Sequence, residues 1–243
     1  MIVPLEWDSA HFGFPVARVD PGDLPLGELE SDLDEASKAG LRLVYCLRPL
    51  DREIPAETLR RFGGRVLTAS ILYRKSLSHG RKDRCDELVI ESLRCVPLPD
   101  DLLPLASGIG LYSRFRVDPD IPEQAFVRLY EIWLERSSKG EIAEQVLVAR
   151  AADGTPLGLI SVVRPDSETG RIGLVGVAEA ARGRGVARAL VAAAETAMEA
   201  GGARRTEVAT QLENAAACGL YESFGYEAGT PERAYHFWLE PTR

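Results

Sequence analysis

The feature that most constrains this chain is a glycine-punctuated, arginine-bearing turn at residues 182–188. The apolar stretch before it, residues 170–177, reads as a strand, and residues 184–200 have the apolar spacing of a helix that ends at a Gly-Gly pair. The first turn of a helix leaves N–H groups without partners, and its aligned peptide dipoles place partial positive charge there. A diphosphate fits such an end where small residues let it approach the backbone. The predicted anion-binding residues are Arg182, Gly183, Arg184, Gly185, Val186, Ala187 and Arg188.

Two better-known phosphate-binding loops do not match this turn. A dinucleotide-binding fingerprint read from Gly183 needs a small residue at position 188, where this chain has an arginine. A P-loop needs a Gly-Lys-Ser/Thr run, which the sequence lacks. What remains is the pattern Arg-x-x-Gly-x-Ala, from Arg182 to Ala187, and its meaning depends on the sequence that follows.

The sequence after the turn adds a second set of signals in a fixed order. Residues 205–210 read as a strand, Asn214 stands where a helix N-cap belongs, and residues 215–224 read as a helix that stops at a glycine. Asn214 and Tyr221 are separated by about two helical turns, so both face roughly the same side of this helix. Two such motifs in order are much rarer by chance than either alone.

These two motifs resemble the GNAT superfamily of N-acetyltransferases. The family pattern Gln/Arg-x-x-Gly-x-Gly/Ala matches residues 182–187, and its Tyr-x-x-x-Gly-Phe/Tyr helix end matches residues 221–226. The resemblance implies an α/β (α+β) fold in which a mixed central sheet with splayed strands is flanked by helices. The order of elements expected over residues 102–239 is two helices, three strands, helix, strand, helix and strand, which agrees with that fold.

The resemblance also implies acetyl-CoA as the cosubstrate and gives roles to single residues. The amides of the turn would hold its pyrophosphate, the backbone N–H of Val175 would face the thioester carbonyl, and Val177 would pair with the pantetheine arm. Tyr221 would protonate the departing thiolate, because a phenol with a pKa of about 10 suits a thiol with a pKa of about 8.5. Asn214 would contact the pantetheine or only cap its helix.

Glycine also interrupts the strand before the turn, at positions 173 and 176. Glycine inside a strand indicates a bulge or a place where another backbone or a ligand comes close. In the family, the pantetheine arm lies beside this strand, so these glycines are interpreted as part of the same site.

The chain is expected to form two domains. Residues 1–97 are predicted to be a smaller α/β domain that could be a partial copy of the same fold, and residues 98–243 the catalytic, acetyl-CoA-binding domain. A proline-bearing segment at residues 95–101 reads as the linker. In the first half, strands are expected at residues 16–19, 41–47, 66–77 and 87–94, helices at 26–39 and 56–62, and an exposed charged segment at 78–86.

Composition narrows the classes of partner. A chain of 243 residues with 45% hydrophobic residues can bury a substantial core. The net charge of -8 argues against nucleic acid or an anionic membrane as partner. No stretch approaches the roughly 20 apolar residues of a membrane helix, and no leader is apparent, so a cytoplasmic protein is expected. The cysteines and histidines lack the spacing of a metal site, so no metal is expected. The thiols of Cys46, Cys85, Cys95 and Cys218 are interpreted as reduced.

The amine acceptor is less well defined by the sequence. Residues 5–14, 113–116 and 234–239 resemble those of bacterial TDP-fucosamine (dTDP-4-amino-4,6-dideoxygalactose) N-acetyltransferases, which implies a nucleotide-linked amino sugar as the small-molecule amine substrate. Another small amine such as an antibiotic or an amino acid, a protein N-terminus, and a non-catalytic module that binds acyl-CoA all stay open, as does a homodimer. His11 and His236 are interpreted as structural histidines, with a base or a substrate contact as the alternative. Arg114 and Arg116 could meet either a nucleotide diphosphate or a solvated acid, and the second interpretation is preferred.

Overall fold

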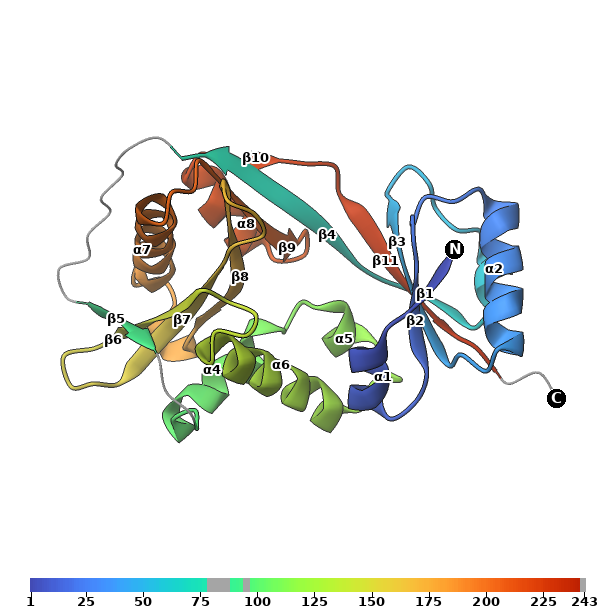
Figure 1. Ribbon diagram of the computed structural model, residues 1–243, viewed down its shortest axis with the longest axis horizontal. Coiled ribbons are helices and arrows are strands. Elements are labelled where there is room, and N and C mark those ends of the chain that lie inside the picture. The colour runs from blue at the N-terminus through green and yellow to red at the C-terminus, as the bar shows by residue number, and fades with distance from the viewer. Residues whose placement is uncertain (78–87, 94–96, 241–243) are drawn as a thin grey trace.

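The computed structural model describes residues 1–77, 88–93 and 97–240, which form one mixed sheet flanked by helices (Figure 1). The strands run in the order β1-β2-β3-β11-β4-β9-β8-β7-β6-β5, and β10 pairs with β4 outside this path. The strands are β1 (Ile2–Pro4), β2 (Val16–Val19), β3 (Leu43–Pro49), β4 (Gly64–Ser76), β5 (Val89–Leu93), β6 (Gln145–Arg150), β7 (Pro156–Val163), β8 (Thr169–Val177), β9 (Arg205–Gln211), β10 (Glu227–Ala228) and β11 (Glu232–Trp238). The α-helices are α1 (Glu6–Phe12), α2 (Leu26–Lys38), α3 (Ala56–Arg61), α4 (Leu103–Ile109), α5 (Arg114–Val117), α6 (Glu123–Ser138), α7 (Val186–Ala200) and α8 (Ala215–Ser223), with 3-10 turns η1 (Asp100–Leu102) and η2 (Glu179–Ala181).

Strands from the two halves of the sequence interleave in the sheet. The C-terminal strand β11 lies between β3 and β4 and is antiparallel to both. The 13-residue strand β4 pairs with β11 along its first part and with β9 from Ser70 to Ser76, and it crosses between the two sides of the molecule in Figure 1. Strand pairing therefore crosses the boundary expected at residues 97 and 98, and the division into two domains stays a prediction.

A bulge in β8 changes which face of the sheet its side chains meet. The register between β7 and β8 shifts between Ile160 and Val162, and the Leu174 N–H donates to Ser161 Oγ at 2.7 Å. Residues two apart in a regular strand share a face, yet Ile172 packs in the cluster with α7, whereas Leu174 packs in the cluster with α4 and α6. The bulge thus reverses the alternation just before the end of the strand.

The same strand separates from its parallel neighbour. Strand β8 pairs with β9 from Thr169 to Ile172, and none of the described residues of β8 beyond Ile172 pairs with β9. Strand β9 meanwhile continues to Gln211 in its pairing with β4. The sheet is therefore splayed along residues 173–177, as the resemblance to the GNAT superfamily implies.

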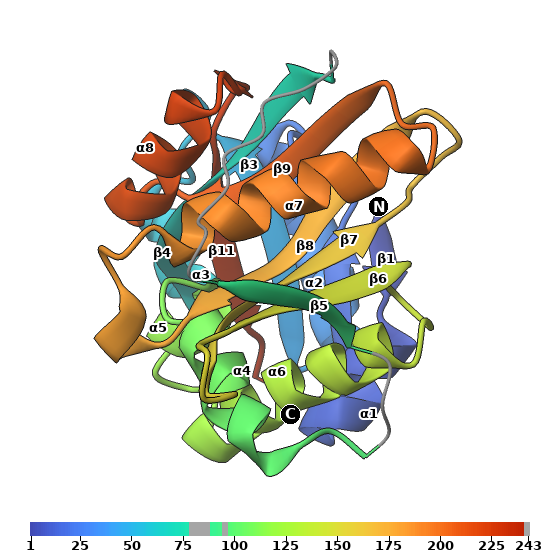
Figure 2. The same ribbon diagram turned by 90° about the vertical axis from the view of Figure 1, so that its left-hand side faces the viewer.

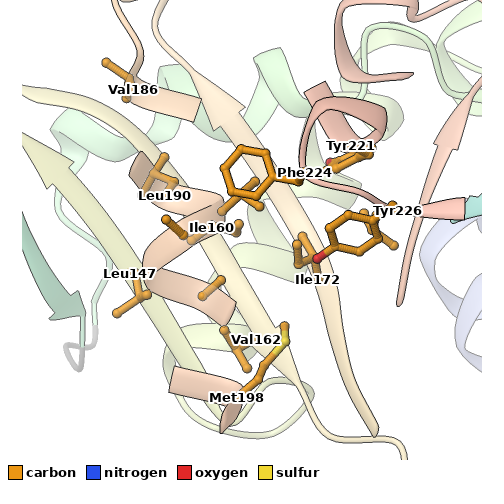
Figure 3. Packing of buried hydrophobic residues seen from close by; sticks show 14 of the residues in the cluster. Leu147, Ile160, Val162, Ile172, Val186, Leu190, Met198, Tyr221, Phe224 and Tyr226 are labelled. Carbon is orange, nitrogen blue, oxygen red and sulfur yellow. The ribbon is translucent and has the colours of Figure 1, made fainter. Parts of the chain in front are cut away.

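Helices cover both faces of the splayed strands. Figure 2 shows α7 on one side of β7 and β8 and α4 and α6 on the other. On the α7 side, the core contains Leu190, Ile160 and Tyr221, which Figure 3 shows close together.

Among the described helices, none combines the length and the apolarity needed to cross a membrane.

Most elements expected from the sequence are present. The strand at 16–19 has the expected bounds. The helix expected at 184–200 starts only at Val186, because Gly185 is its N-cap with a φ of 79°. Helices α1 and α5 and strand β1 were not predicted, since they are too short for periodicity to reveal. The segment 78–86 lies outside the described residues.

Candidate active site

The predicted anion-binding turn links η2 to α7. Gly183 and Gly185 have φ angles of 74° and 79°, in the left-handed region that favours glycine. A Cβ added to either residue would meet nothing within 4 Å, so backbone conformation rather than packing requires glycine. Among the described residues, no side chain caps α7, and its first turn contains no acidic residue. The loop therefore leaves open space in front of a helix N-terminus whose positive end is not neutralised.

The arginines of this turn divide into two kinds. Arg182 and Arg184 are exposed, and neither forms an ion pair with a described residue. The Arg188 guanidinium instead donates to Ser223 Oγ at 2.9 Å and lies 5.0 Å from the centre of the Phe224 ring. Arg188 thus connects α7 to α8, while Arg182 and Arg184 face solvent beside the turn.

The two residues after Gly185 can meet a ligand in different ways. Val186 is buried in the core on the α7 side, so only its backbone is placed to face the turn. Ala187 is half-buried. The predicted roles of Val186 and Ala187 in holding an anion therefore concern their amides, and they stay predictions.

The splayed end of β8 lies next to this turn. Val175 and Val177 are half-buried and pack against the cluster on the α7 side. Packing within the protein accounts for both strand glycines. A Cβ on Gly173 would lie 2.7 Å from Ser161 Oγ, and one on Gly176 would lie 2.7 Å from Ile109 Cγ1 in α4. The glycines thus mark the bulge and the close approach of a helix, and contact with a ligand is not needed to explain them.

Tyr221 and Asn214 are both well placed by α8. Asn214 Oδ1 accepts a hydrogen bond from the Ala217 N–H at 3.2 Å, so the predicted helix cap is present. Tyr221 is 3% exposed, and its ring lies 5.9 Å from that of Tyr73 and 5.7 Å from that of Tyr226. Burial raises the pKa of the Tyr221 phenol, which therefore stays protonated at neutral pH. Burial thus keeps the proton on the phenol but makes Tyr221 a weaker acid than an exposed tyrosine, and its role as the acid stays a prediction.

Two further polar side chains near the rings of Tyr221 and Tyr226, those of Tyr73 and Lys75, were not predicted from the sequence. Tyr73 of β4 donates its hydroxyl proton to the Glu222 carboxylate at 2.9 Å, and burial raises the pKa of this phenol as well. Lys75, also in β4, is paired with Glu195 of α7. Both come from the N-terminal half, and nothing in the local sequence connects them to residues more than a hundred positions away.

A pocket of about 460 Å³ adjoins the turn on the α4 side of the sheet. Its walls come from three places: helix α4, the start of α6 with the preceding α5, and the segment from Val177 to Arg182. The lining side chains include Leu105, Phe126, Val127, Arg116 and Arg182. The lining also includes Glu123 and Glu179, so this pocket combines apolar side chains with charges of both signs.

The remaining candidates have mixed environments. His11 Nε2 lies 2.9 Å from the Ala125 carbonyl, and His236 Nδ1 donates to Asp118 at 2.6 Å, so both histidines have structural partners. Arg116 pairs with Glu123 at 3.1 Å, as expected for an exposed charge. Arg114 differs from this expectation, because its Nε is buried without a hydrogen-bond partner. Among the described residues, which include Cys46 and Cys218 as free thiols, no group of His, Cys, Asp and Glu side chains could hold a metal ion.

Comparison with known proteins agrees with this arrangement. Residues 111–226 match the acetyltransferase (GNAT) family. The dTDP-fucosamine acetyltransferase of Escherichia coli O6:H1 is 33% identical over 138 residues, which are 57% of each chain. The mycothiol acetyltransferase of Beutenbergia cavernae is 40% identical over 80 residues, 33% of this chain and 27% of the relative. The chain thus aligns with little more than half of the first relative's length and about a quarter of the second's.

Two solved structures share the fold across nearly the whole chain. A conserved protein of unknown function from Staphylococcus epidermidis superposes with a TM-score of 0.61 at 14% identity, covering 93% of this chain and 85% of that one. A tandem GNAT protein from the clavulanic acid biosynthesis pathway superposes with a TM-score of 0.59 at 16% identity, covering 95% and 77%. Residues 111–226 of this chain thus match the GNAT family of acetyltransferases, and the superpositions show that the chain shares the fold of these solved structures.

Proposed function

We propose that the protein is an acetyl-CoA-dependent N-acetyltransferase whose acceptor is the amine of a nucleotide-linked amino sugar. The observation that carries this proposal is the position of the uncapped N-terminus of α7 beside the splayed end of β8. Open space at Gly183 and Gly185 suits a pyrophosphate, which a side chain at either position would hold away from the amides. The 33% identity to a dTDP-fucosamine acetyltransferase supports the nucleotide sugar as acceptor.

In this proposal, acetyl-CoA supplies an acetyl thioester, and residues of this chain arrange its transfer. The amides at residues 183–188 bind the diphosphate, and Val177 orients the pantetheine arm. The Val175 N–H donates to the carbonyl oxygen as negative charge develops on it, an interaction worth about 3 kcal/mol. Asn214 caps α8 and thereby helps to hold Tyr221 in place.

The transfer itself replaces a C–S bond with a C–N bond. The neutral amine attacks the acetyl carbon and afterwards releases a proton to solvent, while the departing sulfur takes a proton from Tyr221, whose phenolate then regains a proton from solvent. An amine with a pKa of about 8 pays about 1.4 kcal/mol to be neutral at pH 7, whereas a pKa of about 10.4 costs about 4.6 kcal/mol. Neighbouring ring oxygens lower the pKa of a sugar amine, so such an acceptor needs little help from a base.

The 40% identity over 80 residues to a mycothiol acetyltransferase supports a second candidate, another small amine. Thiol release from acetyl-CoA would be followed with a panel of a dTDP-linked 4-amino sugar, an aminoglycoside, free amino acids and a peptide with a free N-terminus. We expect the nucleotide sugar to give the highest kcat/KM. A higher value for another amine would overturn the proposed acceptor, and coenzyme binding without turnover of any amine would favour a non-catalytic acyl-CoA-binding module.

A further inference from the structure

Arg114 in α5 is a half-buried cation whose Nε has no hydrogen-bond partner. Its Nε is buried and has no hydrogen-bond partner, and no carboxylate of the described residues forms an ion pair with it. The centre of its guanidinium lies 4.8 Å from the Tyr45 ring and 4.5 Å from the Phe115 ring. The two aromatic rings hold the planar guanidinium in place but provide no oxygen that could accept a hydrogen bond from its Nε–H.

This arrangement is costly for the folded protein. A buried ionised group normally pairs with an opposite charge, because loss of water is otherwise not compensated. Burial lowers the pKa of Arg114 from its usual value, which reflects this cost. Asp8 is the nearest source of compensating charge, but Tyr45 donates to its carboxylate at 3.4 Å, and burial raises the pKa of Asp8. The Arg114 Nε–H thus lacks an oxygen acceptor, which an oxyanion of a ligand could supply.

Arg114 lies on the side of the sheet from which an acceptor can approach. Phe115 and Phe126 belong to the cluster that packs against Leu174 on the face opposite α7. The pocket beside Val177 is on this same face and reaches α5 at Arg116, whose guanidinium lies 5.5 Å from the Phe126 ring. When the coenzyme is bound at the start of α7, the acceptor must bind on the face of the sheet where α5 lies.

We propose that Arg114 binds a phosphate of the acceptor through its guanidinium N–H groups. The inference rests on the proposed function, and it names the phosphate as the group of a nucleotide-linked amino sugar that Arg114 recognises. The N-terminal half contributes to this recognition, because Tyr45, which packs against the guanidinium, comes from β3. A guanidinium fork matches two phosphate oxygens and supplies the charge compensation that the fold leaves out. Arg114 is a binding residue in this proposal and takes no part in proton transfer.

Calorimetric titration of thymidine diphosphate into the protein saturated with CoA tests this assignment. Saturating CoA fills the turn at the start of α7, so that site cannot account for further diphosphate binding. We expect the wild-type protein to bind thymidine diphosphate more tightly than thymidine. Arg114→Gln should weaken thymidine diphosphate binding about 10- to 100-fold, as expected for loss of charge-assisted hydrogen bonds. Arg114→Lys should restore only part of it, because an ammonium lacks the fork.

The matched control is Arg128→Gln, which removes an exposed arginine of α6 that pairs with Glu131 at 3.3 Å and should leave binding unchanged. Thermal unfolding and the CoA titration report whether each variant is folded. Unchanged thymidine diphosphate binding in folded Arg114→Gln would overturn the inference, as would a wild-type protein that binds none in the presence of CoA. Failure of the proposed function would appear separately, as absent CoA binding or absent acetyl transfer.

Discussion

Lys75 Nζ in β4 lies 2.8 Å from each of the two carboxylate oxygens of Glu195 in α7. The side chains are only 18% and 8% exposed, so this ion pair is largely withdrawn from water. Lys75 also lies 5.4 Å from the Tyr226 ring and 5.7 Å from the Phe224 ring. A strand from the N-terminal half is thereby tied to the helix whose first turn is the proposed coenzyme site.

Removing one partner of this pair should cost more than removing both. Lys75→Met leaves the Glu195 carboxylate buried without compensation, and we expect the free energy of unfolding to fall by about 3–5 kcal/mol. Lys75→Met combined with Glu195→Leu should recover most of that loss. Urea unfolding of the single and double variants gives the coupling energy. Lys139→Met, which breaks the exposed pair with Glu135, serves as the control and should change stability far less. Additive effects at Lys75 and Glu195 would contradict the prediction.

Substitution at the N-cap of α7 should abolish coenzyme binding. Gly185→Glu introduces a negative charge and a side chain into the open space where the diphosphate is proposed to lie, and we expect the Kd for acetyl-CoA to rise more than about 100-fold. Gly202→Glu is the matched control at the other end of α7, because Gly202 also has a positive φ, of 92°, and open space around it. Calorimetry would measure both Kd values. Equal affinity in the two variants would place the coenzyme elsewhere.

Loss of the Tyr221 hydroxyl should affect turnover and not coenzyme binding. We expect Tyr221→Phe to keep the Kd for acetyl-CoA within about 3-fold and to lose about 10²- to 10⁴-fold in kcat, as typical for removal of a general acid. Tyr235→Phe removes another buried hydroxyl, one that accepts from the Ile54 N–H at 3.5 Å in a different cluster, and should keep its kcat. Steady-state thiol release decides between the outcomes. An unchanged kcat in Tyr221→Phe would assign the residue to the core alone.

Buried His236 should make stability depend on pH. Its pKa lies below the usual value because burial disfavours the charged ring, although Asp118 favours it. The unfolded chain, with a histidine pKa of about 6.5, therefore binds more protons in mild acid. The contribution of His236 to the free energy of unfolding should be fully present above pH 6.5. Below pH 6.5 this contribution should fall by up to about 1.4 kcal/mol per pH unit.

His236→Asn provides the comparison, because an asparagine N–H can still donate to Asp118 but does not titrate. We expect its stability to fall less steeply than that of the wild type between pH 6.5 and pH 5 in urea unfolding experiments. The lowered pKa of Asp118, caused chiefly by the His236 hydrogen bond against the effect of burial, adds a dependence only below about pH 4. Parallel pH profiles of the two proteins would refute the role given to His236.

Local sequence signals sufficed for the turn and for the elements that bracket it. A glycine with positive φ, an asparagine N-cap and regular apolar spacing depend on a few neighbouring residues, so Gly185, Asn214 and α7 could be predicted from the sequence. Gly173 also indicated that the strand contains a bulge. The reversal of faces between Ile172 and Leu174 was not, because Ser161 of another strand holds the Leu174 N–H.

The sequence by itself determined the order of elements and the turn, because both are encoded by conformational preferences over a few residues, and the fold class followed from the resemblance of two motifs to the GNAT family. Only the tertiary structure decided that β11 lies between β3 and β4, that Lys75 meets Glu195, and that Arg114 Nε is buried without a hydrogen-bond partner. These features depend on contacts between segments more than 60 positions apart, where burial and charge compensation are set by the assembled sheet and leave no local pattern in the chain.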